Sequence, residues 1–442
     1  MCPRLILFFD ESNVSIDLAG GKGVNLAILK RNGFPVPNGF IITTQAYQAF
    51  IETNNLAEFI DKQMAGLTFD NYDSIDSAST LIRDRFTTGV MPSELVEQTY
   101  QAYEKLNNAP VAVRSSATME DLPGFSFAGQ HDTFLNVITK ETLLEAVVKC
   151  FSSLWTARVI QYRHRNDVSH KDLSIAVVVQ EMVASEASGV LFSANPLTGK
   201  RNEVVIEAIL GLGEALVSGQ VEPDRYTVDI DGRILSKKLG SKSVVIHGSR
   251  SGGTLVRTED ARDHPALTDK QIQELAQLGY RVGKYYDSPQ DIEWAFTGEK
   301  LYLLQARPIT SLYPLPSKLS PDPFRILFSF NIIQGLLDPI TPLGQDVIQS
   351  FLLGVGKIFG YHISFEAQTA LWSAAERLWI NITPLIRNRF LRQISQKALP
   401  VVEPETMHIL NSLLDDPQLA SNIGLPKLRT LKNFTRIYLV LL

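Results

Sequence analysis

Cysteine is scarce in this sequence of 442 residues, which contains only Cys2 and Cys150. Two thiols cannot form a disulfide framework or a thiolate metal cluster, so both kinds of scaffold are excluded. Long apolar runs are also lacking: none reaches the length of a bilayer-spanning helix, and the run before Asp10 has no small-residue cleavage site. We therefore expect a cytoplasmic protein without a membrane partner.

Neither sign of charge dominates the chain. The formal net charge at pH 7 is −5, and there is no dense basic stripe of the kind that binds nucleic acid. Nucleic acid is therefore not an expected partner, and any bound anion must be held by a local group of side chains. The length exceeds that at which a single hydrophobic core usually stops growing, so two or more domains are expected.

Helix-type and strand-type patterns alternate over the first 310 residues, which predicts a mixed α+β fold. A first helix is expected to start near Gly21 and to end at Gly33. Thr44 is the expected N-cap of a second helix, and the stretch from Thr68 to Ser79, rich in Asp, Asn and Ser, is expected to be a loop. The predicted strands lie at the N-terminus and at 40–44, 175–180, 189–193, 203–207, 226–230 and 301–305, and a further helix is predicted at 141–161.

A proline-rich segment divides the chain. Residues 311–323 contain four prolines and no periodicity, which is typical of a semi-rigid linker. We predict one domain over residues 1–313, a linker at 314–323 and a second domain over residues 324–442. Aromatic side chains of the second domain could line a pocket, but such residues at helical spacing usually belong to the core. The helices expected in the second domain lie at 332–360 and 367–399.

Three short stretches carry groups that bind phosphate or a metal. Lys22 lies between glycines where a turn becomes a helix, so the helix N-terminus and the ammonium group can both face an anion. Arg114 ends an apolar strand, where a guanidinium can contact phosphate through two N–H groups. Glu293 and Gln305 lie on two strands joined by a tight hairpin and can offer two oxygens to one Mg²⁺. Arg307 points to the same face as Gln305.

Each of these residues has an ordinary structural alternative. Lys22 could be a surface lysine on a flexible turn, and Arg114 could form a buried ion pair. Glu293 and Arg307 could take part in a salt bridge at the sheet edge. The amide of Gln180, at the end of a buried strand, could be a structural hydrogen-bonding group. The residue types alone leave these alternatives open.

The order and wording of these stretches resemble the ATP-grasp nucleotide-binding domain shared by phosphoenolpyruvate synthase, pyruvate phosphate dikinase and rifampicin phosphotransferase. The resemblance extends from the start of the chain to about Thr310. Two further stretches, at 189–196 and 207–219, also match, although the family usually has a polar or aromatic pair where this chain has Ile209 and Leu210. The main matching phrases are GGKG at 20–23, AVRSSA at 112–117, DIEW at 291–294 and LQARP at 304–308.

The resemblance implies an ATP-grasp fold with ATP and Mg²⁺ as cofactors. It marks Lys22, Arg114 and Arg307 as catalytic groups that neutralise the charge of the triphosphate. It marks Glu293 and Gln305 as the Mg²⁺ ligands. The full set of nucleotide-binding residues that it implies is Lys22, Arg114, Gly129, Thr133, Gln180, Glu293, Gln305 and Arg307.

The segment between Thr118 and Asp132 is rich in glycine and is expected to form a lid over the nucleotide. His131 is expected to be a loop residue, because this family places its phosphorylated histidine in another domain. None of the seven histidines of the chain lies in a motif similar to Thr-Ser-His-Ala, the motif around the phosphorylated carrier histidine. The expected partner is therefore a phosphohistidine carrier domain, supplied in cis or in trans.

The stretch Leu336–Gly344 is similar to the opening of the helical substrate domain of rifampicin phosphotransferase, so the second domain is expected to be the start of such a domain. The resemblance implies an AMP-forming, ATP-dependent phosphotransferase that passes a phosphoryl group through the carrier histidine to a substrate hydroxyl. The expected acceptor is a large apolar hydroxyl compound. The alternatives are a phosphoenolpyruvate synthase-like enzyme acting on pyruvate, and a nucleotide-binding fragment without turnover.

Overall fold

The computed structural model describes most of the first 312 residues and several shorter stretches beyond them. Gly129 and the expected lid from residue 119 onward lie outside the described residues, as do Leu336 and parts of the expected linker. The chain divides into two compact units, Met1–Ser311 and Leu312–Leu442. The described residues are 3–118, 133–165, 168–170, 173–258, 261–312, 315–316, 319, 323–330, 339–358, 364–365, 368, 370–388 and 417–419.

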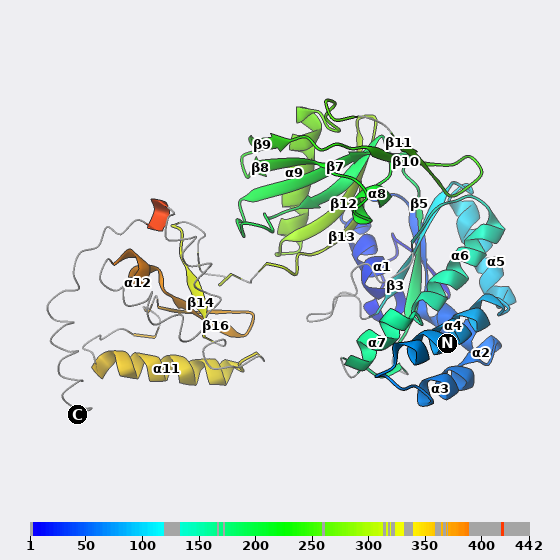
Figure 1. Cartoon of the computed structure of the whole chain (residues 1–442), viewed down its shortest axis with the longest axis horizontal. Coiled ribbons are helices and arrows are strands. Elements are labelled where there is room, and N and C mark those ends of the chain that lie inside the picture. Colours follow the sequence, from blue (N-terminus) through cyan, green and yellow to red (C-terminus); the bar gives the residue numbers. More distant parts are fainter. Residues whose placement is uncertain are drawn as a thin grey trace. The chain divides into compact units, whose positions relative to one another are not determined.

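The first unit contains a five-stranded antiparallel sheet with the strand order β1-β2-β5-β3-β4 (Figure 1). Alternation along a strand decides which face each side chain joins. In β5, Val177 and Val179 join the core on one face, whereas Ala176 and Val178 join the core on the other face, which also contains residues of helix α1. The strands are β1 (Ile6–Phe8), β2 (Gly39–Ile42), β3 (Val111–Ala117), β4 (Thr133–Val137) and β5 (Ile175–Glu181).

Helices cover both faces of this sheet. Helix α1 packs against β5 and β3 on one face, and α2, α5 and α6 pack on the other, with α3 and α4 completing that core. Both layers are built from apolar side chains at helical spacing. The helices are α1 (Ile16–Arg31), α2 (Thr44–Thr53), α3 (Leu56–Ala65), α4 (Tyr72–Thr87), α5 (Ser93–Lys105), α6 (Lys140–Ser153) and α7 (Ala157–Arg165).

A second, six-stranded antiparallel sheet has the order β13-β12-β6-β7-β8-β9 (Figure 1). Ile292 and Trp294 of β12 are buried against residues of helix α9, while Asp291 and Glu293 point to the opposite, polar face. The polar face of β12 and β13 is the part of the fold that carries the candidate site. The elements are β6 (Ala187–Phe192), β7 (Glu203–Leu210), α8 (Glu214–Val217), β8 (Asp224–Asp229), β9 (Ile234–Lys238), the hairpin β10 (Val244–Gly248) and β11 (Thr254–Thr258), α9 (Asp269–Tyr285), β12 (Gln290–Thr297) and β13 (Lys300–Pro308).

The strands predicted from the sequence are all confirmed, but the loop expected from Thr68 to Ser79 is wrong from Tyr72 onward. Tyr72–Thr87 forms helix α4, with Asn71 as its N-cap. Ile75 and Phe86 on this helix are fully buried. Apart from the buried Ser79, the polar residues between them lie on the solvent side of an amphipathic helix, and their number conceals the helical period.

Two helix boundaries also differ from the prediction. The N-cap of α2 is Thr43, whose hydroxyl accepts the backbone N–H of Ala46 at 3.4 Å, and not Thr44. The single helix expected over 141–161 is divided, since α6 ends at Ser153 and α7 starts four residues later. Ser153 donates its hydroxyl hydrogen to the Cys150 carbonyl at 2.7 Å, a local bond that competes with the continuing helix.

In the second unit, the helix expected over 332–360 is confirmed from Pro342 to Ile358, as α11, whereas residues 339–341 are not helical. The helix expected over 367–399 is wrong between residues 371 and 381, where β15 and β16 form a hairpin. Its turn residues, Ala375 and Glu376, both have positive φ (47° and 56°), as a two-residue hairpin turn requires. The elements are β14 (Leu327–Ser329), α11 (Pro342–Ile358), β15 (Leu371–Ala374), β16 (Arg377–Asn381), α12 (Thr383–Arg387) and a 3₁₀ turn at Pro417–Leu419.

None of the helices in the described part of the chain combines the length and the apolarity that a bilayer crossing requires.

Candidate nucleotide-binding site

The glycine-rich stretch before Lys22 produces a kink inside α1. Gly20 has a non-helical backbone (φ 65°, ψ 176°), and helical geometry resumes at Gly21. A Cβ atom at position 20 would lie 2.2 Å from the Ser116 carbonyl oxygen, so no side chain fits there. Glycine at this position therefore allows α1 to approach strand β3 closely.

Ser116 holds the two sides of this kink together. Its hydroxyl accepts the backbone N–H of Gly23 at 3.1 Å and donates to the carbonyl of Ala19 at 2.8 Å. One serine of the Arg-Ser-Ser-Ala phrase thus has a structural role. The Gly23 amide, expected to face an anion at the helix N-terminus, is bonded to this serine instead.

Lys22 extends from α1 to β3, where its ammonium donates to the carbonyl of Ser115 at 3.2 Å. Ser115 follows Arg114 directly in the strand. The side chain of Lys22 is therefore held beside the strand that carries Arg114, and the alternative of a surface lysine on a flexible turn does not fit.

Arg114 meets the two predicted metal ligands. Its Nη1 lies 3.1 Å from Oε2 of Glu293 and 3.5 Å from Oε1 of Gln305. Glu293 and Gln305 are directly paired across β12 and β13, so their side chains share one face of the second sheet. The Arg114 side chain is only 11 % exposed, and its Nε is buried without a hydrogen-bond partner in the described part of the chain. The ion pair anticipated as an alternative for Arg114 is thus present, and it joins residues that are 179 positions apart.

Arg307 forms a second ion pair one step along the same face. Its Nε and Nη2 lie 2.9 and 2.8 Å from the same oxygen, Oδ2, of Asp291, its cross-strand partner. Burial raises the pKa of the Asp291 carboxyl, although Arg307 acts in the opposite direction, and Glu293 and Glu207 add to the rise. The arginine side chain is 41 % exposed, so Asp291 anchors a cation that still reaches solvent.

Gln180 and Thr133 lie on the strands that flank β3. Gln180 pairs with Ala112 of β3 and with Gly39 of β2, and its side chain is on the same face of the sheet as Arg114. It is 1 % exposed, and its Nε2 has no hydrogen-bond partner among the described residues. Thr133 is exposed and pairs directly with Arg114. Both residues are therefore close to β3, whereas the other predicted contact, Gly129, lies outside the described residues.

The backbone N–H groups of the two residues after Gln180 have hydrogen-bond partners within the protein. The backbone N–H of Glu181 donates to the Asn38 carbonyl at 2.9 Å, and that of Met182 donates to the Pro110 carbonyl at 2.8 Å. These two donors are thus engaged within the protein. The buried Gln180 Nε2 remains as a polar group able to face a ligand.

The oxygens of Glu293 and Gln305 suit Mg²⁺. They are hard ligands, and both already contact one cationic nitrogen of Arg114, so they can share a single cation. Nowhere in the described ranges do three or more His, Cys, Asp or Glu side chains gather to hold a metal. A magnesium ion here would therefore take two ligands from the protein and the rest from water and phosphate, which is the usual pattern for nucleotide-bound Mg²⁺.

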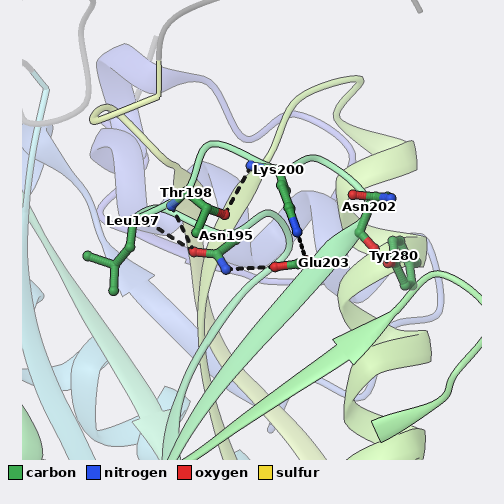
Figure 2. A network of polar contacts seen from close by, with 7 residues as sticks. All are labelled: Asn195, Leu197, Thr198, Lys200, Asn202, Glu203 and Tyr280. Atoms are coloured by element: carbon green, nitrogen blue, oxygen red, sulfur yellow. Dashed lines mark hydrogen bonds and ion pairs between the residues drawn. The ribbon is translucent and has the colours of Figure 1, made fainter. Parts of the chain in front are cut away.

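The phrase that ends in Asn195-Pro196 has a structural explanation (Figure 2). Asn195 Oδ1 accepts the backbone N–H groups of Leu197 and Thr198 at 3.1 and 3.2 Å, and its Nδ2 donates to Glu203 Oε2 at 2.8 Å. Lys200 Nζ donates to the other oxygen of Glu203 at 2.7 Å. The network fixes the turn between β6 and β7 and does not include the residues around Arg114.

Replacing Asn195 by alanine should lower the free energy of unfolding by about 1–3 kcal/mol, because backbone donors and a carboxylate lose a buried partner. The expected result is a lower urea midpoint in fluorescence-monitored unfolding. Asn202→Ala is the matched control, since Asn202 joins this network through its backbone carbonyl, which accepts the Tyr280 hydroxyl at 3.2 Å. Equal midpoints for the two variants would contradict the assignment.

Three polar residues beside the site were not predicted from the sequence: Asp291, Glu207 and Arg225. Asp291 was part of a matching phrase, and its spacing of two from Glu293 was the signal that both lie on one face. Glu207 lies in the same cross-strand row as Glu293, separated from it by Val190, and it is ion-paired with Arg225 in the next strand. This row depends on the register of four strands, which no local pattern reveals.

Residues 16–321 match the family described as the pyruvate phosphate dikinase AMP/ATP-binding domain. The chain belongs to this family. It is 40 % identical over 400 residues to "Rifampicin phosphotransferase" of Bacillus subtilis (strain 168), covering 89 % of this chain and 44 % of that protein. It is 41 % identical over 319 residues to "Probable phosphoenolpyruvate synthase" of Methanocaldococcus jannaschii, covering 70 % of this chain and 27 % of that protein. The chain thus spans less than half the length of these relatives.

The family membership bears directly on the predicted phrases. The matched range contains Lys22, Arg114, Glu293, Gln305 and Arg307, and it ends ten residues beyond the first structural unit. An AMP/ATP-binding domain of a phosphotransferase or synthase family is therefore the established class of this chain.

Proposed function

We propose that the first unit is an ATP-grasp domain that binds Mg-ATP and transfers a phosphoryl group to a carrier histidine, in a phosphotransferase similar to rifampicin phosphotransferase. The observation that carries the proposal is the convergence of Arg114 with Glu293 and Gln305, three residues from separate parts of the sequence. Lys22 adjoins the same strand as Arg114, and Arg307 lies on the same face as Gln305. Three cations and two oxygen ligands in one place suit a metal-bound triphosphate.

Arg114 is bonded to Glu293 and Gln305 in this structure, which are the oxygens that Mg²⁺ would need. Nucleotide binding therefore involves an exchange of partners, in which Arg114 turns from the two oxygens to phosphate. Every charge keeps an opposite partner in both states, so the exchange avoids leaving a buried charge unpaired. When bound, Mg²⁺ would neutralise charge on the phosphate oxygens.

Asp291 has a positioning role in this proposal. It holds the guanidinium of Arg307 through Nε and Nη2 and so fixes the orientation of this cation. Fixing the arginine before the nucleotide arrives lowers the entropy cost of forming that contact. Lys22 approaches from α1, Arg114 from β3 and Arg307 from β13.

The relatives favour a rifampicin phosphotransferase-like acceptor over pyruvate. The alignment with the Bacillus subtilis protein covers 400 residues and so continues past Ser311 into the second unit, whereas the alignment with the synthase covers 319. Shared sequence in the second unit supports a shared acceptor class, a large apolar compound with a hydroxyl group. A phosphoenolpyruvate synthase-like activity is the second candidate.

The proposal is tested by the effect of Mg²⁺ on ATP binding to wild type and Glu293→Gln, measured by calorimetry with and without a chelator. Wild type should bind Mg-ATP in a one-to-one complex. The variant should bind Mg-ATP about tenfold or more weakly, because a charged ligand is lost, while metal-free ATP should bind at least as well.

Glu299→Gln serves as the matched control, because Glu299 lies in the turn of the same hairpin and its side chain is 91 % exposed. It should behave as wild type. Absence of ATP binding to wild type, or an equal response to Mg²⁺ in Glu293→Gln, would overturn the proposed site.

A further inference from the structure

A cavity of about 240 Å³ lies in the helical part of the first unit, beside α3 and α7. Its apolar walls include Met64, Phe69 and Ile160. Its polar lining consists of Arg163, His164, Ser169 and His170. None of these residues belongs to the nucleotide site described above. The cavity therefore needs its own explanation.

Arg163 is a buried cation in the cavity wall. Arg163 is only 2 % exposed, and its guanidinium lies over the ring of Trp155, 4.7 Å from the ring centre. Nη1 donates to the carbonyl of Leu154 at 3.0 Å, but Nε and Nη2 are buried and have no hydrogen-bond partner among the described residues. Within the described ranges no carboxylate lies at ion-pairing distance from it. A buried charge usually has a counter-ion, because desolvation is costly.

The rim of the cavity adds two imidazoles. His164 is exposed and stacks on Phe69, with ring centres 3.6 Å apart and an angle of 8° between the planes. His170 Nε2 lies 2.8 Å from Oδ1 of Asp61, the acidic group at this rim. Helix α7 itself contains no acidic residue. The cavity thus combines apolar walls with a predominantly basic lining.

We propose that this cavity binds a small organic anion, with the acidic group of the ligand near Arg163 and the two histidines and its apolar part against Phe69 and Ile160. A carboxylate or a phosphate monoester would provide the counter-charge that Arg163 lacks among the residues that the structure describes. The apolar walls would favour a ligand with an aromatic or aliphatic body. The site is separate from the nucleotide site and does not depend on the function proposed for it.

The competing explanation is that Arg163 only fastens the end of α6, through the Leu154 carbonyl and Trp155. A purely structural arginine predicts that the cavity has no preference for anions. The two explanations differ in what the exposed rim residues do, since these can be changed without removing the buried arginine.

The experiment uses the full chain at pH 6, with benzoate, phenyl phosphate and inorganic phosphate as probes and benzyl alcohol as the neutral comparison. Binding is followed by the NMR signals of the histidine rings. We expect benzoate or phenyl phosphate to shift the His164 and His170 signals with saturation, and benzyl alcohol to shift them little. Inorganic phosphate should bind more weakly than phenyl phosphate, because it lacks the apolar body.

Variants separate the possible outcomes. His170→Gln should weaken binding of the organic anion by roughly tenfold or more, as expected for loss of a charge-assisted contact, while His264→Gln, at an exposed histidine that does not line the cavity, should not. Lys22→Ala should leave this binding unchanged, which distinguishes the cavity from the nucleotide site. Equal binding of benzyl alcohol and benzoate, or no shift of the two histidine signals up to tens of millimolar, would overturn the proposal.

Discussion

Replacing Arg114 by alanine should weaken Mg-ATP binding by about 1.5–3 kcal/mol, or roughly 10- to 150-fold. The substitution removes a charge-assisted contact to phosphate. It also removes Nη1 of Arg114, which lies 3.1 Å from Glu293 Oε2 and 3.5 Å from Gln305 Oε1. Calorimetric titration measures the change directly. Lys22→Ala should show a loss of similar size, because its ammonium is held on the same strand.

Two controls sharpen this test. Arg114→Lys keeps the charge but not the planar fork, so it should recover only part of the affinity. Arg233→Ala removes an arginine that is 76 % exposed and pairs with Asp229, away from the site, and it should bind as wild type does. Unchanged affinity in both Arg114→Ala and Lys22→Ala would show that the ion pair with Glu293 is only structural.

The residues proposed for this site could be named from the sequence because each lies in a short motif that carries its chemistry. Glycines on both sides of Lys22 and a hairpin turn between Glu293 and Gln305 are local signals, and the hairpin fixes which side chains face together. The sequence does not show that Arg114 reaches across to the other sheet. That contact joins residues 179 positions apart, and only the packing of the two sheets places them together.

The two wrong predictions of secondary structure, at α4 and at the β15–β16 hairpin, also arise because local composition does not reveal packing. The Asp and Ser residues on the exposed side of α4 favour a loop, although Ile75 and Phe86 anchor this helix in the core. The hairpin of β15 and β16 lies in a stretch predicted to be helical, and its turn residues, Ala375 and Glu376, are both good helix formers. In each case packing or backbone geometry outweighed local composition.

Ser116 shows a limit of reasoning from phrases. The Arg-Ser-Ser-Ala phrase suggested a phosphate site, yet this serine bonds Gly23 and Ala19 across the kink of α1. Its effect on the site is indirect, because it fixes the position of the helix that carries Lys22. A residue of a functional motif can therefore act by positioning the backbone and need not contact the ligand itself.

The second large effect is expected in turnover. If the first unit passes its phosphoryl group to a histidine on a separate domain, the 442-residue polypeptide should bind ATP but should not release AMP steadily, since no carrier phrase surrounds its seven histidines. Adding a phosphohistidine carrier domain together with a rifamycin-like acceptor should give continuous AMP release. The measurement is AMP formation over time by chromatography, with each acceptor and with none.

The control for this prediction is the same carrier domain with its reactive histidine replaced by alanine, which should give no turnover. Arg307→Ala in the present chain should also abolish carrier-dependent AMP release, because Arg307 is expected to neutralise charge that develops during transfer, an effect typically worth about 10³–10⁵ in rate when supplied by an arginine. Asp291→Asn should have an intermediate effect, since it loosens the Oδ2 contacts to Nε and Nη2 without removing the cation. Steady, acceptor-dependent AMP release by the chain alone would show that the phosphoryl group does not pass through a separate carrier.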